Sequence, residues 1–542
     1  MIFSKQGFLA RAAAAALFVF LAAGCAHVPA SRFLVVAAHP LASDAGHAVL
    51  ERGGSAVDAA IAVQMVLGLV EPESSGIGGG AFLLHWSEHE RTLRSYDGRE
   101  TAPAAASSNR FLKEDGTPQA FVKAVVGGRS VGVPGVLRML ELAHRRHGIL
   151  PWHELFEPAI RLAEQGFVMS PRLRMQLASE RFLRDDPQAR KLYYGADDHP
   201  RERLINPEYG ATLRAIATKG ADAFYRGDIA RDLVRAVHAG GGDLTEQDLA
   251  GYQALEREPL CGPYRQWRIC SMGPPSSGGL AVLQILGILE RTQFARTQPH
   301  SAAAVHLFAE AGRLAYADRA FYVGDPGYVS VPTTKLIDGS YLDQRAKLIG
   351  ERSMRQALPG GTEGIGTSHF SIVDVGGNVV SMTTTIESTF GSRIMVRGFL
   401  LNNELTDFDF MPGSANQVAP GKRPRSSMAP TLVFDAAGEV RIALGSPGGP
   451  NIINYVAKAL VGMLDWGLDV QAAVALPNFG SRNGPTLIEK GSTYAALRAE
   501  LEGRNHHVEV APLTSGLHAI ERVRGGWRGG ADPRREGTAR GD

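Results

Sequence analysis

The stretch that decides the fold is "GIGTSHFSIVDVGGN", residues 364–378. Thr367 stands between a flexible Gly-Ile-Gly and an alternating run that is typical of a strand. On one interpretation, the glycines merely loosen a loop before a sheet begins. On the other, the Gly366–Thr367 bond is cut, because a threonine whose own α-amine is free can use that amine as a base and becomes a strong nucleophile. The rest of the chain decides between them.

Composition places the chain among ordinary globular proteins. It has 542 residues, of which 44% are hydrophobic and 21% charged, enough for a large core and more than one usual domain length. The net charge of +2 gives no overall field that favours nucleic acid. No long apolar run follows the first 25 residues, so nothing in the body of the chain is expected to span a membrane.

The N-terminus has the pattern of an export signal. Lys5 and Arg11 precede an apolar stretch over residues 12–23, and small residues follow it. The run "LAAGC" resembles a bacterial lipoprotein box, in which Cys25 becomes the lipidated first residue; a plain cleaved signal peptide is the alternative. We expect residues 1–24 to be a signal peptide. The mature protein is then expected in the bacterial periplasm, anchored by lipid on Cys25, or otherwise soluble there or secreted.

Two cysteines remain in the body of the chain, in "LCGPYRQWRIC". If Arg265-Gln266 form a two-residue turn, Cys261 lies opposite Cys270 at a position where side chains approach closely. Export permits a disulfide there. Two half-buried free thiols are the alternative, because Arg-Gln suits this turn poorly.

The texture of the chain changes at Thr367. Before it, five segments have helical patterns, and the first is split at Gly53-Gly54; after it, hydrophobic and polar residues alternate as in a sheet. The change falls at the suspected cut. The helical segments cover residues 41–70, 133–165, 208–250, 271–290 (a turn followed by a buried helix) and 301–323.

Two other motifs receive ordinary interpretations. The glycine run at 76–81, "GIGGGA", lacks the spacing of a phosphate-binding loop and predicts a tight turn with close backbone packing. The "NHH" run at 505–507 lacks a regular metal-ligand spacing and is expected at the solvated surface.

Further candidates for chemistry follow Thr367. If residues 375–377 form a turn, Asp374 faces Asn378, and the same register sets Thr385 opposite Thr367, where its hydroxyl can orient the nucleophile. The glycine pair Gly448-Gly449 lies between a strand pattern and a helical one. Such a turn can aim backbone N–H groups at one point, as an oxyanion hole requires.

Together these motifs resemble gamma-glutamyltranspeptidases (glutathione hydrolases) of the N-terminal-nucleophile hydrolase superfamily. The likeness runs from about residue 34 to the C-terminus and is carried by "GGSAVDAAIA", "YDGRETAP", "GTSHFSIVD", "LLNNELTDFD", "KRPRSSMAPT", "GSPGGPNII" and "DPRREG", among others. The resemblance implies an α+β fold, a four-layer αββα sandwich. It also implies a large subunit, 25–366, and a small catalytic subunit, 367–542, interwoven in one unit.

The resemblance also implies roles for single residues. Arg99 would clamp the α-carboxylate of a glutamyl group, a two-pronged task that suits arginine. No metal or organic cofactor is implied. The remaining roles are a nucleophile (Thr367) with its hydrogen-bond partner (Thr385), contacts to the α-ammonium (Glu404, Asp407), further hydrogen bonds to the glutamyl group (Ser426, Ser427), and an oxyanion hole (Gly448, Gly449).

The sequence departs from the family pattern in two places. Glu387 stands where many members carry Asn and some bacterial ones carry Glu; if ionised, it fits beside an ammonium but not beside a carboxylate. The segment from Asp407 to Lys422 is short, so the lid loop of several relatives is expected to be missing and the pocket to be open.

The expected reaction transfers the γ-glutamyl group of glutathione or related compounds to water, or to an amino acid or peptide. One alternative is a glutaryl or cephalosporin-type acylase on the same scaffold. Arg99 and Asp407 argue against it, because an acyl group without an amino-acid head does not need both. Another is an uncut, inactive envelope lipoprotein that binds γ-glutamyl ligands; the intact Thr367 and Thr385 argue against that.

Overall fold

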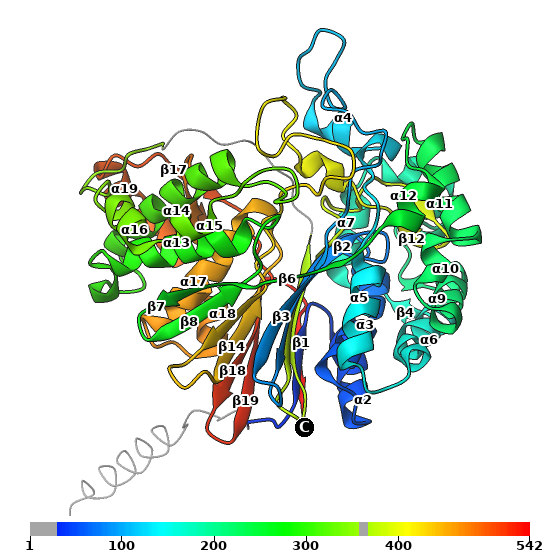
Figure 1. Ribbon diagram of the computed structural model, residues 1–542, viewed down its shortest axis with the longest axis horizontal. Coiled ribbons are helices and arrows are strands. Elements are labelled where there is room, and N and C mark those ends of the chain that lie inside the picture. The colour runs from blue at the N-terminus through cyan, green and yellow to red at the C-terminus, as the bar shows by residue number, and fades with distance from the viewer. Residues whose placement is uncertain (1–29, 357–366) are drawn as a thin grey trace, which may run out of the picture.

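Two antiparallel sheets lie face to face between two layers of helices in the computed structural model (Figure 1), which describes residues 30–356 and 367–542. The predicted αββα sandwich is confirmed. The signal peptide, Cys25 and Gly366 lie outside the described residues. In hydrogen-bonding order, the seven-stranded sheet contains β20 (Thr538–Gly541), β1 (Leu34–Ala37), β9 (Ser368–Val373), β10 (Val379–Thr385), β2 (Gly80–Ser87), β3 (Thr92–Gly98) and β6 (Leu255–Arg257). The six-stranded sheet contains β19 (Gly526–Ala531), β18 (His518–Val523), β14 (Val440–Gly445), β13 (Thr431–Phe434), β8 (Trp267–Ser271) and β7 (Leu260–Tyr264).

Both sheets mix strands from the two sides of residue 367. In the seven-stranded sheet, β1 is hydrogen-bonded to β9 on one edge and to β20 on the other, with Leu34 opposite both Val373 and Gly541. In the six-stranded sheet, β8 pairs with β13. The expected interweaving of the two parts is therefore built into the hydrogen-bond ladders themselves.

Each sheet carries helices on its outer face (Figure 1). One layer consists of α2, α3 and α5 with further helices outside them; the other consists of α13, α14, α17 and α18 with their neighbours. The first group comprises α2 (Pro40–Glu51), α3 (Ala56–Val70), α4 (Phe121–Val125), α5 (Val136–His147), α6 (Glu157–Gln165), α7 (Pro171–Ser179), α8 (Pro187–Tyr193), α9 (Pro207–Lys219), α10 (Asp222–Tyr225), α11 (Asp228–Ala239) and α12 (Glu246–Gly251). The second comprises α13 (Gly278–Glu290), α14 (Ala302–Tyr322), α15 (Thr333–Leu336), α16 (Gly339–Ala346), α17 (Ile452–Leu464), α18 (Val470–Ala475) and α19 (Arg498–Gly503).

Short strands complete the fold at its edges. A three-stranded sheet is formed by β15 (Phe479–Ser481), β16 (Thr486–Glu489) and β17 (Val508–Ala511), and two-stranded pairs by β4 (Phe167–Val168) with β5 (Arg203–Leu204) and β11 (Met395–Val396) with β12 (Phe399–Leu400).

Helix α3 shows why the predicted helices form where they do. Ser55 and Asp58 make a reciprocal capping box, with each side chain accepting the other's backbone N–H. Gly53 has φ 82°, a left-handed conformation that ends α2 before α3 begins, as the sequence predicted. Every residue of α3 is buried, because its apolar side chains cover all faces of the helix.

The space between the two sheets is filled by a separate apolar core. Val36 of β1, Val379 of β10 and Ile520 of β18 belong to it. Trp86 meets Phe434 edge-on across it, with ring centroids 5.0 Å apart. This dry layer fixes the distance between the sheets, and therefore the place of β9, which carries Thr367 at its beginning.

The predicted hairpin after Thr367 is confirmed. Asp374 N–H donates to the Asn378 carbonyl across 3.0 Å, and Thr384 lies opposite Ser368. Continued by one residue, this register sets Thr385 opposite Thr367. The Asp374 carboxylate accepts N–H groups of Asn378 and of Ala56 at the start of α3, so the turn is fastened to the helix layer.

The two body cysteines are paired. Cys261 lies opposite Cys270 in the β7–β8 hairpin and the two are joined by a disulfide. In the parts of the chain that the structure describes, no helix is both long and apolar enough to cross a membrane.

Candidate active site

Thr367 stands just before β9 and is nearly buried, with 3% of its surface exposed. Its hydroxyl donates to the Thr385 hydroxyl across 3.4 Å, and Thr385 Oγ1 accepts the Glu387 N–H at 2.8 Å. The glycine run before β2 packs directly on this pair: a Cβ on Gly79 would lie 2.0 Å from the Thr385 carbonyl oxygen. The close backbone packing expected for that run is confirmed, and this packing restrains the backbone of Thr385.

A charged network holds the backbone around Thr367. Arg535 donates to the Thr367 carbonyl across 3.3 Å, and the Ser368 hydroxyl donates to Glu71 across 2.7 Å. Glu71 in turn pairs with Arg172. Burial lowers the pKa of Arg535 to about 10, and the nearby Arg172 adds to this. Arg535 had no predicted role, although it lies in "DPRREG", one of the motifs that carry the resemblance.

A narrow cavity opens beside Thr367 and gathers nearly all of the predicted site residues. Its free volume is about 20 Å³, so some of the lining side chains must move when a ligand binds. None of the residues that line it comes from 408–425. The open pocket without a lid stays a prediction. The lining consists of Arg99, Thr367, Thr385, Glu387, Glu404, Asp407, Ser426, Ser427, Met428, Gly449, Pro450 and Ile452.

Arg99 is the central cation of this cavity and is 1% exposed. Backbone carbonyls fix its guanidinium: Nε donates to Pro424 at 3.1 Å and Nη2 to Arg425 at 2.9 Å. Its remaining donors pair with the carboxylates of Glu404 and Asp407. The Asp407 side chain is 16% exposed and that of Glu404 only 1%, so Asp407 is the partner that a ligand reaches first.

The carboxyl groups outnumber the cations here, and burial changes their protonation. Burial, together with like-charge repulsion from Asp407 and Glu404, raises the pKa of Glu387 to about 8. Burial also raises the pKa of Glu100 to about 7 and that of Glu404 well above its ordinary value, while Arg99 opposes both shifts. The free site therefore holds protonated carboxyl groups near neutral pH, and a bound cation favours their ionisation.

Glu387 has a fixed place between the nucleophile's partner and the ion pairs. Its backbone has φ 75°, and its carboxylate accepts hydrogen bonds from Ser388 and Asn403. The left-handed backbone is uncommon for a residue other than glycine and marks a constrained position. Asn403 had no predicted role, but it is the neighbour of Glu404 in the motif "LLNNELTDFD".

Two serines close the far wall. Ser427 Oγ accepts from Arg319 of α14 at 2.8 Å, and Ser426 Oγ accepts the Met428 N–H at 3.1 Å. The hydroxyls are thus oriented by their own partners before any ligand is present.

The glycine pair lies at the junction of two cavities. Gly449, with φ 55°, lines the cavity of Thr367, whereas Gly448, with φ 136°, lines a neighbouring one together with Arg172, Arg534 and Arg535. Both φ values are accessible to glycine at little cost. A Cβ on Gly448 would also lie 2.5 Å from the Tyr455 ring. The pair leads into α17, where the amide groups of a helix start point at incoming negative charge.

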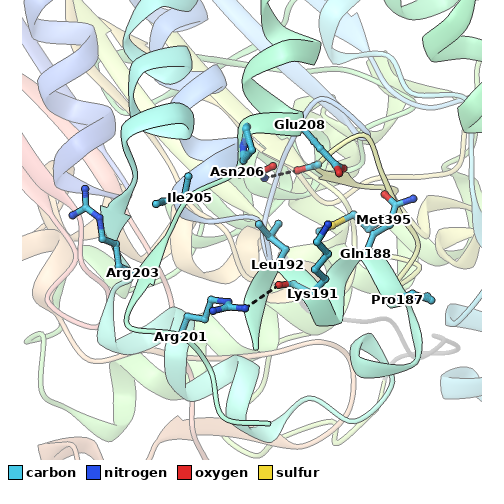
Figure 2. A pocket seen from close by; sticks show the side chains of 12 residues that line it. Pro187, Gln188, Lys191, Leu192, Arg201, Arg203, Ile205, Asn206, Glu208 and Met395 are labelled. Atoms are coloured by element: carbon cyan, nitrogen blue, oxygen red, sulfur yellow. Dashed lines mark hydrogen bonds between the residues drawn. The ribbon is translucent and has the colours of Figure 1, made fainter. Parts of the chain in front are cut away.

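A larger cavity, of about 470 Å³, lies elsewhere and lacks this chemistry. Figure 2 shows it between α8, α9 and the segment around Met395. Arg201 donates to the Lys191 carbonyl and Asn206 to the Gly398 carbonyl. These two polar side chains therefore stabilise the backbone around the cavity. None of the predicted site residues lines it.

Chemically, the narrow cavity joins a hydroxyl nucleophile, backbone amides suited to an oxyanion, and fixed charges of both signs. A ligand with a carboxylate and an ammonium on one carbon matches those charges, because it can enter between Arg99 and Asp407 and pair with each.

Comparison with known proteins agrees with this geometry. The family model described as Gamma-glutamyltranspeptidase matches residues 42–541. The chain is 37% identical to the glutathione hydrolase proenzyme of Bacillus subtilis, over 93% of this chain and 91% of that one. It is 38% identical to the Acylase ACY 1 proenzyme of a Pseudomonas strain, over 92% and 91%. Among solved structures, the cephalosporin acylase from Bacillus halodurans superposes with a TM-score of 0.84 at 28% identity, over 94% of this chain and 96% of that one.

Proposed function

The chain belongs to the gamma-glutamyltranspeptidase family, and from that premise we propose that it is a self-processed enzyme that cleaves the γ-glutamyl amide bond of glutathione and related compounds. Thr367 is the nucleophile, and the glutamyl group passes to water or to an amino acid or peptide. The mature enzyme consists of a large subunit, 25–366, and a small one, 367–542. It resides in the bacterial periplasm, held to the membrane by lipid on Cys25.

One observation carries the proposal: a fixed arginine and a reachable carboxylate lie in the same small cavity as a threonine hydroxyl. In the free site Arg99 and Asp407 neutralise each other. A glutamyl head group replaces this one ion pair with two, Arg99 to its α-carboxylate and Asp407 to its α-ammonium. Glu404 accepts a hydrogen bond from Arg99 Nη1 and so fixes the orientation of the guanidinium plane. The γ-amide then extends toward Thr367.

Processing supplies the catalytic base. The Thr367 hydroxyl attacks the Gly366 carbonyl, the peptide C–N bond breaks as an ester forms, and water hydrolyses that ester. The freed α-amine has an ordinary pKa of about 7.7–8.0, close to working pH, so it can take the hydroxyl proton. Thr385 holds the hydroxyl in place, and Arg535 holds the carbonyl of the same residue.

Turnover then follows two matched steps. Thr367 Oγ1 adds to the γ-carbonyl carbon, and the Gly448 and Gly449 amides stabilise the oxyanion. The C–N bond breaks, the leaving amine takes the proton held by the α-amine, and an acyl-enzyme ester remains. Water or an acceptor amine attacks that ester and restores Thr367. The neighbouring cavity, with Arg172 and Arg535 on its wall beside Gly448, is the side from which an acceptor with a carboxylate approaches.

The experiment follows glutamate release and chain cleavage together. Purified protein is incubated with glutathione, and the product is quantified while a denaturing gel reports the chains. Wild type should show two chains and release glutamate; Thr367→Ala should show one chain and no release. Equal cleavage in the variant would assign the cut to an outside protease and remove the main support for the mechanism.

One observation favours the acylase function: the sequence identity of this chain to an acylase proenzyme is as high as its identity to the glutathione hydrolases. A glutaryl amide separates the two, because it keeps the carboxylate and lacks the amine. If the wild type turns over the glutaryl amide as fast as the γ-glutamyl one, the acylase function replaces the proposed one. Binding of a γ-glutamyl ligand without cleavage of either would leave an inactive binding protein.

A further inference from the structure

A second group of ligand-type side chains lies where α14 meets the segment after α19, at the end of the molecule that also holds β17 (Figure 1). His306 and Glu310 stand four residues apart on α14 and share one of its faces. His506 reaches them from the other side; one ligand atom of each lies within 4.8 Å of the others, and all three residues are buried. The structure thus corrects the prediction that residues 505–507 are all at the surface: His507 is exposed and His506 is not.

This cluster is separate from the catalytic cavity. Arg319, the residue of α14 that contacts Ser427, lies about 20 Å further along the helix axis than His306, at 1.5 Å per residue. None of the three residues lines the cavity of Thr367.

The two histidine rings meet through one nitrogen each. His306 Nδ1 faces His506 Nε2 at 2.7 Å, and the rings are nearly perpendicular, at 89°. Their outer nitrogens are held: His306 Nε2 donates to the Gly350 carbonyl at 2.8 Å, and His506 Nδ1 lies 2.7 Å from Thr486 Oγ1. In metal sites the outer nitrogen of a ligating histidine is usually fixed by such a partner, which sets the tautomer and aims the inner one.

Glu310 has the outer partners of a ligating carboxylate as well. Ser353 Oγ donates to its Oε1 at 2.7 Å, and the Met354 N–H donates to its Oε2 at 3.0 Å. Arg313 Nε lies 3.1 Å from Oε1 and offsets part of the carboxylate charge. Oε2 has this one donor and retains a lone pair for a cation, since a carboxylate can accept about four hydrogen bonds.

We propose that His306, Glu310 and His506 form a binding site for a zinc-type divalent cation. Two imidazoles and one carboxylate suit Zn²⁺, with water in the fourth position. Tetrahedral Zn–N bonds of about 2.0–2.1 Å place the two nitrogens about 3.3 Å apart, so the rings must separate by only about 0.6 Å. The proton of His506 moves from Nε2 to Nδ1 and stays on the ring, where Nδ1–H donates a hydrogen bond to Thr486 Oγ1 and the Thr486 hydroxyl proton turns away. The ring therefore stays neutral and no proton is lost.

The bound cation would tie together the two sides of the cleavage point. His306 and Glu310 precede residue 357, whereas His506 follows residue 367. The site also fastens residues 350–354, near the end of the large subunit, through the bonds of Gly350 and Ser353 described above. The cross-link between subunits rests on the proposed processing, but the metal site does not. A cavity of about 580 Å³ with His506 on its wall gives the cation a way in.

Metal titration tests the site without using the catalytic reaction. Protein made without a histidine tag is processed, stripped with EDTA, dialysed and titrated with ZnCl₂, and separately with CoCl₂. We expect one zinc per pair of chains and the intense visible absorption of four-coordinate Co²⁺. Zinc at a hundredfold excess over its Kd should raise Tm by about 2–3 °C for a protein of this length. Glutathione hydrolysis is scored separately, so failure of either proposal is recognised on its own.

Variants assign the ligands. His506→Asn and Glu310→Gln should lose at least roughly a hundredfold in zinc affinity, while the adjacent, exposed His507→Asn should keep it. Wild type that takes up no stoichiometric zinc and gives no four-coordinate cobalt spectrum would overturn the proposal, even if the variants do not fold. So would His506→Asn with wild-type affinity; the pair would then be a hydrogen-bond relay only.

Discussion

At the scale of single residues, Arg99 and Asp407 divide the two charges of an amino-acid head group between them. Arg99→Ala removes the carboxylate partner and Asp407→Ala the ammonium partner, each leaving a charge unpaired in a narrow cavity. We expect each variant to lower kcat/KM for a γ-glutamyl amide at least roughly tenfold, equivalent to about 1.4 kcal/mol. Steady-state kinetics on the processed proteins measure this.

A glutaryl amide serves as the internal control for that pair. Arg99→Ala should impair turnover of both amides, whereas Asp407→Ala should impair only the γ-glutamyl one, because the glutaryl group has no ammonium. Self-cleavage should survive Asp407→Ala, since processing needs no bound glutamyl group. Equal losses on both amides in Asp407→Ala would show that Asp407 acts by holding Arg99 instead.

The raised pKa of Glu387 predicts that KM for the γ-glutamyl donor depends on pH. Its pKa, raised to about 8 by burial, leaves it mostly protonated at pH 6.5 and mostly ionised at pH 8.5. An ionised carboxylate attracts the α-ammonium of the donor, so KM should benefit as pH rises through 8. The ratio of KM in Glu387→Gln to KM in wild type should therefore grow by up to roughly tenfold over that range. The ratio cancels titrations that both proteins share; a constant ratio would mean that Glu387 does not contact the ammonium.

The same titration has an effect on stability with a definite sign. A carboxyl whose folded pKa is raised from 4.5 to about 8 ionises first in the unfolded chain. Its contribution to folding is therefore most favourable below about pH 4.5 and is lost as pH rises toward 8. Glu387→Gln should reduce that loss, which denaturant unfolding of the uncut Thr367→Ala precursor at pH 5 and pH 8 can detect.

At the scale of elements, the glycine run before β2 determines where β10 ends. A Cβ on Gly79 would lie 2.0 Å from the Thr385 carbonyl oxygen, a backbone atom that cannot move without the strand. Gly79→Ala should destabilise the protein by about 1–3 kcal/mol and displace Thr385 from Thr367. Slower self-cleavage and a lower kcat would report the displacement.

Gly76 supplies the matched control. It lies in the same run, and the nearest atom to its added Cβ would be the Gly68 Cα, at 3.8 Å, an ordinary contact. Gly76→Ala should therefore keep nearly wild-type stability and activity. If both variants behave alike, general stiffening of the loop, and not the contact with Thr385, explains the effect.

At the scale of the whole molecule, the sheets hold the proposed subunits together. Strands β1, β2 and β8 from the first subunit pair with β9, β10 and β13 from the second, and the apolar core between the sheets draws on both. The cleaved protein should elute as one species in size-exclusion chromatography under native conditions. The chains should separate only in denaturant, and elution of free small subunit without it would contradict this account.

The sequence predicts those parts of the fold that depend on neighbours along the chain. The break at Gly53-Gly54 and the turn between Asp374 and Asn378 are local signals, and the structure confirms the elements that they predict. The four-layer arrangement and the charged site residues Arg99, Glu404 and Asp407 follow instead from the resemblance, whereas Thr367 and Thr385 are already indicated by the local pattern. Arg535 was missed because its contact with Thr367 spans 168 positions, and the burial of His506 because packing against α14 leaves no local trace.

The pairing of β1 with β20 has a consequence for engineering the chain order. Arg32 N–H donates to the Asp542 carboxylate across 2.7 Å, so the first and last described strands end side by side. A short linker can therefore join residue 542 to residue 30. The gene can then begin at Thr367, after a removable initiator methionine, and end at Gln356. In such a circular permutant, translation itself supplies the free threonine amine.

The permutant should release glutamate from glutathione as a single uncut polypeptide on a denaturing gel. A folded permutant without activity would show that self-cleavage contributes more than a free amine. Activity in the permutant would show that the inactive precursor is not required by the fold. The free threonine amine can then come either from self-cleavage or from placing Thr367 at the start of the gene.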